Sequence, residues 1–148
     1  MKKPLNEVVL LIEDNDDHAE LAEFYIKNYD DAITVLRLPD GAAAMDYLAD
    51  VKQSKQAVPW LVILDLKLPK YNGHEILNSI KSNKALLTIP VIIFSTSANQ
   101  QDVEQAYAMH ANSYLVKPME SDGYEGIVNT LLDYWSIDQH YLLKAGQN

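Results

Sequence analysis

The stretch LVILDLKLPKYNG, residues 61–73, places a single acid at the end of an apolar run. Four apolar residues precede Asp65, and a turn follows that opens with Pro69 and closes with Gly73. A lone carboxylate in an apolar core is costly, because burial favours its neutral form. Asp65 therefore either lies just beyond the core at the end of a strand or has charged partners there.

Length and composition predict one domain with a single core. The chain has 148 residues, of which 48% are hydrophobic and 22% charged, as in an ordinary globular protein. It contains no cysteine, which excludes disulfides and thiolate chemistry. The net charge of −9 argues against nucleic acid as a partner, because phosphate binding needs clustered Lys and Arg. No apolar run approaches the roughly 18 residues of a membrane span, and the start lacks a signal-peptide pattern. We therefore expect no membrane partner and a cytoplasmic location.

Short apolar runs alternate five times with helical patterns. The runs that predict strands are residues 7–12, 33–38, 60–64, 90–94 and 113–116. The patterns that predict helices are residues 16–28, 41–51, 73–82, 99–110 and 122–135. Continuous apolar runs are typical of a parallel sheet that helices cover on both faces. We predict an α/β fold, a doubly wound five-stranded parallel sheet of order 2-1-3-4-5, with its site at the carboxyl ends of strands 1 and 3.

Polar side chains follow four of the five expected strands. Carboxylates follow the first and third strands, hydroxyls follow the fourth and an amine follows the fifth: Glu13, Asp14, Asp65, Ser95, Thr96 and Lys117. Because the carboxyl ends of parallel strands share one edge of a sheet, we expect these side chains to converge. Asp65 would then lie among other acids at the point where the winding reverses.

Three converging carboxylates repel one another unless a cation lies between them. A cluster of oxygen ligands without His or Cys suits Mg²⁺, with Mn²⁺ as a substitute. Lys117 adds positive charge, and the hydroxyl of Ser95 or Thr96 adds a neutral donor. A carboxylate nucleophile, a divalent ion, a lysine and a hydroxyl together are equipped for phosphoryl transfer.

Four segments, in this order, resemble the receiver domain of two-component response regulators, the CheY-like family. The segments are LLIEDND (10–16), LVILDLKLPKYNG (61–73), PVIIFSTSAN (90–99) and YLVKPME (114–120). The second and third are most similar to single-domain regulators paired with phytochrome kinases. The resemblance implies a receiver domain over residues 5–136, followed by a C-terminal tail over residues 137–148.

The resemblance implies a phosphoacceptor and a metal site. Asp65 would take a phosphoryl group from the phosphohistidine of a sensor histidine kinase, which is the implied partner. Asp14 would bind Mg²⁺ directly and Glu13 through a water. The backbone carbonyl of Lys67 would complete the protein ligands.

The resemblance also assigns the remaining positions of the family pattern. Lys117 would pair with Asp65 and then with the phosphoryl group. Ser95 takes the hydroxyl position, with Thr96 one place further on, and Tyr114 takes the aromatic switch position. Pro118 would carry a cis bond that aims Lys117, since cis bonds are plausible only before proline.

Plainer interpretations stay open beside these roles. Asp14 and its neighbours could form only a helix N-cap, and Ser95 with Thr96 could be ordinary capping residues. Lys117 could be a surface lysine, and Tyr114 could be plain core packing. The four histidines show no ligand spacing, so we interpret them as surface or helix residues.

Other functions fit the sequence less well. A dinucleotide-binding domain needs glycines after its first strand, and residues 13–16 contain none. A phosphatase of the haloacid dehalogenase type needs an acid at position 67, where this chain has Lys67. A receiver-like binding module without phosphoryl transfer is the second alternative, although neither an acid nor the lysine is missing.

The segment after Trp135 is too short for an output domain. We therefore expect the output to be a contact with a downstream protein that the sequence does not name, or a role as phosphate shuttle or sink. Tyr134 and the apolar residues of the tail lack an obvious core position: Ile137, Tyr141, Leu142 and Leu143. We expect a homodimer through the last helix and the tail, and the alternative is a tail that folds back on its own sheet edge or is disordered.

Overall fold

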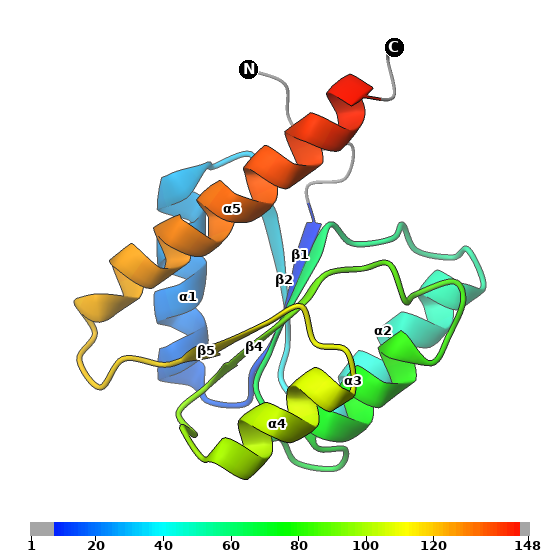
Figure 1. Ribbon diagram of the computed structural model, residues 1–148, viewed down its shortest axis with the longest axis horizontal. Coiled ribbons are helices and arrows are strands. Elements are labelled where there is room, and N and C mark those ends of the chain that lie inside the picture. Colours follow the sequence, from blue (N-terminus) through cyan, green and yellow to red (C-terminus); the bar gives the residue numbers. More distant parts are fainter. Residues whose placement is uncertain (1–7, 146–148) are drawn as a thin grey trace.

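The computed structural model describes the backbone of residues 8–145 and the side chains of residues 8–136, and strands alternate with helices along it (Figure 1). The strands are β1 (Val8–Ile12), β2 (Thr34–Leu38), β3 (Leu61–Leu64), β4 (Val91–Ser95) and β5 (Ser113–Val116). The helices are α1 (Asp16–Tyr29), α2 (Gly41–Lys52), α3 (Gly73–Lys81), α4 (Gln100–Ala108) and α5 (Gly123–Ala145).

The five strands form one sheet in the order β2-β1-β3-β4-β5, and every neighbouring pair is parallel. The predicted fold class and strand order are confirmed. β1 pairs with β2 on one side and with β3 on the other, so the winding reverses between β1 and β3. The carboxyl ends of all five strands therefore point to one edge of the sheet.

Helices cover both faces of the sheet (Figure 1). Side chains alternate along β1, so Val9 and Leu11 pack on one face while Leu10 and Ile12 pack on the other. The first face packs against α1 and α5, and the second against α2, α3 and α4. Burial on both faces explains why the strand segments are continuously apolar.

Side-chain caps set the start of four helices. The backbone N–H groups of the first turns donate to the side chains of Asn15, Asp40, Asn72 and Asn99. At α3 the bond is reciprocal, because Glu75 also accepts the N–H of Asn72. These caps end the loops that carry the polar residues at the carboxyl edge.

The last helix is longer than the sequence pattern predicts. α5 was expected to end near residue 135, but it continues to Ala145. The segment 136–145 contains neither Gly nor Pro, so nothing in it stops helical hydrogen bonding before Gly146.

The other elements begin and end within two residues of the predicted bounds. The apolar side chains expected to mediate a dimer from the tail lie outside the described residues, and the domain bounds 5–136 and 137–148 stay a prediction.

Candidate functional site

The carboxyl edge of the sheet holds the buried polar residues of the described chain. They come from four different strand ends: Glu13, Asp65, Ser95 and Lys117. All the other residues buried among positions 8–136 are apolar, apart from glycine and proline. Four buried polar groups at one edge are unusual in a core this apolar, because each must find partners there.

Asp65 directly follows β3 and is only 7% exposed. Its Oδ1 accepts the backbone N–H of Lys67 at 3.3 Å, and its Oδ2 accepts from Lys117 Nζ at 3.0 Å. Gly73 lies against this loop, because a Cβ at that position would come within 2.4 Å of the Asp65 carbonyl oxygen. The glycine therefore lets α3 begin directly beneath the acid.

Lys117 follows β5 and reaches back across the sheet edge. Its ammonium group donates to Glu13 Oε1, to Asp65 Oδ2 and to a ring nitrogen of His18. Its backbone N–H donates to Ser95 O at 2.7 Å, which continues the pairing of β5 with β4. The interpretation of Lys117 as a surface lysine is wrong, since the residue is 4% exposed.

The peptide bond before Pro118 is trans, so the expected cis bond is wrong. Lys117 reaches both carboxylates with the trans bond in place. A trans bond before proline is also the intrinsically favoured form, by about 0.5–1 kcal/mol.

Three carboxylates meet beside Lys117. One oxygen each from Glu13, Asp14 and Asp65 lies within 4.8 Å of the other two. The pKa of Glu13 is raised to about 7, because burial and then the charge of Asp65 raise it by more than the hydrogen bond from Lys117 lowers it. A compact set of oxygen donors whose mutual repulsion a cation would relieve fits a hard divalent metal ion.

Backbone and side-chain contacts hold Glu13 in place. Its Oε2 accepts the N–H of Asn15 at 3.1 Å, and its carbonyl accepts from Arg37 Nε at 3.0 Å. Arg37 also forms an ion pair with Asp16 at 2.7 Å. Asn15 is at the same time the N-cap of α1, so the capping interpretation of this loop is correct but incomplete.

The two hydroxyl candidates differ in position. Ser95 is fully buried, and its Oγ accepts the N–H of Ser97 at 3.3 Å. Thr96 is exposed, as is Lys67 on the neighbouring loop. Ser95 is therefore the hydroxyl enclosed at the sheet edge.

Tyr114 connects β5 to the loop after β4. Its hydroxyl donates to Ser97 O at 2.8 Å, and its backbone N–H donates to Tyr107 Oη on α4 at 3.1 Å. The ring is half-buried, and this burial raises the pKa of its hydroxyl. Tyr114 therefore packs against the core and also contacts the segment that begins at Ser95.

Two residues near Lys117 were missed by sequence reasoning. His18 was interpreted only as a surface or helix residue, but its Nδ1 lies 3.0 Å from Lys117 Nζ. Tyr124 is 2% exposed, and its ring centroid lies 6.4 Å from that of His18. No spacing or motif in the sequence indicated either position, because α1 begins only at Asp16 and His18 has no second ligand-type residue at helical spacing.

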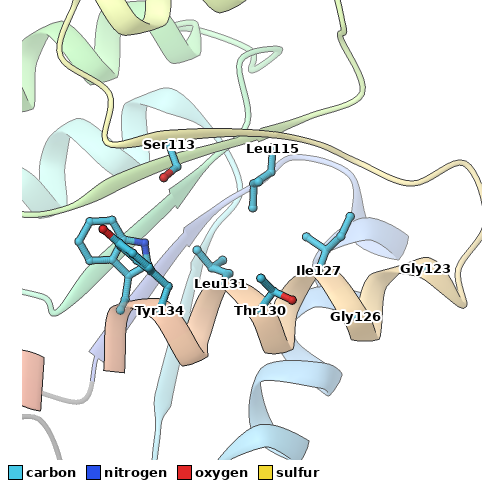
Figure 2. A pocket seen from close by; sticks show the side chains of 9 residues that line it. Ser113, Leu115, Gly123, Gly126, Ile127, Thr130, Leu131 and Tyr134 are labelled. Carbon is cyan, nitrogen blue, oxygen red and sulfur yellow. The ribbon is translucent and has the colours of Figure 1, made fainter. Parts of the chain in front are cut away.

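A groove lies apart from this edge, between β5 and the first half of α5 (Figure 2). Its volume is about 570 Å³. Mostly apolar side chains line it, including Leu115, Ile127, Leu131, Tyr134 and Trp135. Tyr134 is 62% exposed, so this part of α5 presents apolar surface to solvent.

Comparison with known proteins identifies the class to which this fold and site belong. The family model for the response regulator receiver domain matches residues 9–128. The chain belongs to this family and is a receiver of two-component signalling.

Several relatives match over most of their length. The probable methanogenesis regulatory protein FilR2 of Methanothrix harundinacea is 38% identical over 86% of this chain and 83% of its own. The response regulator Rcp1 of Synechocystis is 36% identical over 86% of this chain and 88% of its own. The phosphorylated cyanobacterial phytochrome response regulator RcpA superposes with a TM-score of 0.82 at 34% identity, covering 88% of this chain and 94% of its own. Rcp1 has also been solved in a Mn²⁺-bound form, with a TM-score of 0.81 at 34% identity, covering 88% of this chain and 94% of that one.

None of the helices within residues 8–145 combines the length and the apolar character needed to cross a bilayer.

Proposed function

We propose that Asp65 is the residue of this receiver that accepts the phosphoryl group. The observation that carries the proposal is that Asp65, alone among the acids of the site, is both buried at the end of the central strand and paired with Lys117. An Asp65 oxygen attacks the phosphorus of a phosphohistidine on a sensor histidine kinase. The new P–O bond forms as the P–N bond breaks, and the imidazole leaves with the electron pair and takes up a proton.

The acid cluster supports Mg²⁺ as the metal of this site, with Mn²⁺ as a substitute. Asp14, Asp65 and the backbone carbonyl of Lys67 would hold the ion directly, and Glu13 would hold it through a water. When bound, the ion supplies positive charge for the phosphoryl oxygens. The exposure of Asp14 supports a metal that keeps several waters.

Lys117 and the hydroxyls supply the donors that the protein itself contributes. The ammonium group of Lys117 lies beside Asp65 and is placed to pair with the phosphoryl oxygens once the acyl phosphate forms. Ser95 is the stronger hydroxyl candidate because it is buried, while the exposed Thr96 could contribute its own group from the loop. Hydrogen bonds to an anion are charge-assisted and stronger than neutral ones, so each of these donors would stabilise the phosphoryl group.

We propose that Ser95 and Tyr114 form the switch. Ser95 would move toward the phosphoryl oxygens, and Tyr114, which hydrogen-bonds two residues further along the same loop, would follow it. The surface that changes is then α4, β5 and α5, residues 99–135. A downstream protein would bind this surface, and self-catalysed hydrolysis of the acyl phosphate, which releases inorganic phosphate and the Asp65 carboxylate, would restore the starting state.

Acetyl phosphate with Mg²⁺ and an intact-mass measurement tests the acceptor. We expect the native protein to gain one phosphoryl group and Asp65→Asn to gain none, because the amide keeps the shape but is not a nucleophile. Asp46→Asn is the matched control, an exposed acid on α2 that should leave the mass gain unchanged. Stable phosphorylation of the Asp65→Asn protein would show that another residue is the acceptor.

We further propose a homodimer through α5. The support is the apolar groove beside β5 together with the exposed Tyr134, since contiguous apolar surface usually marks a contact. A twofold partner is the simplest cover, because most soluble oligomers are symmetric dimers.

Sedimentation at tens of micromolar, with and without acetyl phosphate, tests the dimer. We expect the native chain to associate and Tyr134→Glu to be a monomer. Phe24→Glu is the matched control, because it changes an equally exposed aromatic residue on α1. A chain that ends at Ser136 should also dissociate. A native chain that is monomeric under both conditions would contradict the dimer.

The cytoplasmic location expected from the sequence stays a prediction.

A further inference from the structure

The ammonium group of Lys117 has three N–H donors and three acceptors within reach. Two acceptors are the carboxylates of Glu13 and Asp65, with Asp65 Oδ2 at 3.0 Å. The third is His18 Nδ1, also at 3.0 Å. An ammonium group only donates, so this ring nitrogen must carry the lone pair and the imidazole must be neutral, with its proton on Nε2.

The surroundings of His18 hold its ring in this orientation. Its backbone N–H donates to Oδ1 of the N-cap Asn15 at 3.0 Å, which fixes the first turn of α1. Its ring is half-buried, and the buried ring of Tyr124 lies beside it. Burial lowers the pKa of His18, and the charge of Lys117 lowers it further, which favours the neutral ring.

A neutral third acceptor has a consequence for the reaction. Glu13 and Asp65 both accept hydrogen bonds from this ammonium group. His18 approaches from α1 and satisfies the remaining N–H without adding a third negative charge. The ammonium group is then held in one orientation, with one N–H directed at Asp65.

We infer that His18 is a positioning residue for Lys117, whose Nδ1 accepts the third ammonium N–H and keeps the amine directed at Asp65. This inference rests on the proposed roles of Asp65 and Lys117. His18 itself touches neither the acceptor oxygen nor the phosphoryl group. Its contribution passes entirely through the orientation of the lysine.

The matched variants are His18→Leu and His18→Asn. Leucine keeps the bulk but has no acceptor, whereas the Oδ1 of asparagine lies near the position of Nδ1. We expect His18→Leu to slow phosphorylation by acetyl phosphate about tenfold, the scale of one hydrogen bond to a charged group, and His18→Asn to restore most of the rate. Glu20→Gln, an exposed residue of α1, should leave the rate unchanged.

A second readout follows the lysine directly. In ¹⁵N-detected NMR spectra, the Lys117 ammonium signal should be visible in the native and His18→Asn proteins and exchange-broadened in His18→Leu. This signal does not depend on phosphoryl transfer. A native protein that is not phosphorylated would therefore contradict the proposed function, and the spectra would still test the contact between His18 and Lys117. If His18→Leu does not fold, His18→Ala, a favourable helix substitution, takes its place in both measurements.

Two results would overturn the inference. One is a His18→Leu protein with the native rate and the native Lys117 signal. The other is equal slowing in His18→Leu and His18→Asn, which would show that the site needs the imidazole for something other than its acceptor. Urea unfolding of each variant identifies any loss that comes only from stability.

Discussion

The interiors of the strands and their carboxyl ends follow opposite rules in this sheet. All residues of β1 and β3 are apolar, and β4 is apolar as far as Phe94, whereas the buried residues at the strand ends include two acids, a lysine and a serine. The interior gains stability from burial of apolar area. The edge gains little or loses stability, because its charges must be taken out of water and then paired. The difference indicates that stability and function occupy separate parts of the same strands.

The sharpest form of this comparison uses two adjacent residues, Leu64 and Asp65. Leu64 is fully buried in the last position of β3, so Leu64→Ala should cost about 2–5 kcal/mol of unfolding free energy while the folded fraction still accepts phosphate. Asp65→Asn should lower stability far less and abolish phosphorylation. Urea unfolding and intact mass measure both properties. The comparison breaks if Leu64→Ala proves as stable as the native protein.

Loss of a metal ligand should affect the edge alone. We expect Asp14→Ala to weaken Mg²⁺ binding by at least about tenfold and to slow phosphorylation in parallel. The metal-free protein should become slightly more stable, because one of three converging carboxylates is gone. Titration calorimetry measures the affinity, with Asp17→Ala as the control on the exposed start of α1. An unchanged Mg²⁺ affinity would exclude Asp14 as a ligand.

The proposed switch would connect the carboxyl edge to the surface that a downstream partner contacts. Ser95→Ala would remove the proposed hydrogen bond to the phosphoryl group, worth about 1.5–3 kcal/mol, so the equilibrium constant between active and inactive states should fall roughly 10- to 100-fold. Hydrogen exchange of the phosphorylated protein should then lose its changes over residues 99–135. Thr96→Ala serves as the control for the exposed hydroxyl. Exchange changes confined to α2 and α3 in the native protein would contradict this switch.

The pH dependence of stability separates the edge from the interior. The pKa of Glu13 is raised from 4.5 to about 7, so its contribution to folding is fully present below pH 4.5 and is lost as the pH rises through 7. Glutamine at position 13 does not titrate. Without metal, the unfolding free energy of Glu13→Gln should therefore rise relative to that of the native protein as the pH increases between these values, by on the order of 3 kcal/mol or less.

Urea unfolding at about pH 5 and about pH 8, without metal and then with Mg²⁺, measures the difference. A bound cation favours the ionised carboxylate of Glu13, so Mg²⁺ should reduce this pH-dependent difference in unfolding free energy. Native and Glu13→Gln curves that stay parallel over this range would show that burial does not penalise the charge of Glu13.

The smallest expected effect concerns the exposed rim of the edge. The Lys67 side chain is exposed on the loop that follows Asp65. We propose that it overhangs the path by which water would reach an aspartyl phosphate. Lys67→Asn should shorten the lifetime of the phosphorylated protein by a few-fold, because an overhanging cation that slows hydrolysis is removed. Lys70→Asn, on the same loop, is the control, and asparagine tolerates its positive φ of 73°. An equal or longer lifetime for Lys67→Asn would refute this role.

Much of the fold follows from the sequence because the two signals that define it are local. Continuous apolar segments indicate strands buried on both faces, and residues such as Asn72 and Asn99 indicate where helices begin. Once the strand order was predicted, the convergence of Glu13, Asp65 and Lys117 followed from the direction of parallel strands. The length of α5 was not predicted, because the stripe of core-facing residues stops at Trp135 and no Gly or Pro marks the end of the helix before residue 146.

The contacts within the site depend on side-chain positions that no spacing encodes. Lys117 was expected to pair with Asp65, but its contact with Glu13 joins residues 104 positions apart and depends on how both side chains cross the edge. The contact of His18 with Lys117 likewise needs the first turn of α1 to lie over the end of β5. A lone histidine without ligand spacing gives no signal of such a contact.

The uninterrupted course of α5 makes this helix a mechanical lever. It begins at Gly123, beside the buried ring of Tyr124, and runs for 23 residues. At 1.5 Å per residue the rod is about 34 Å long, so a tilt of about 5° at its first turn displaces its far end by about 3 Å. A rearrangement near Lys117 too small to alter the sheet would therefore be read as a much larger displacement at the distal end of the helix.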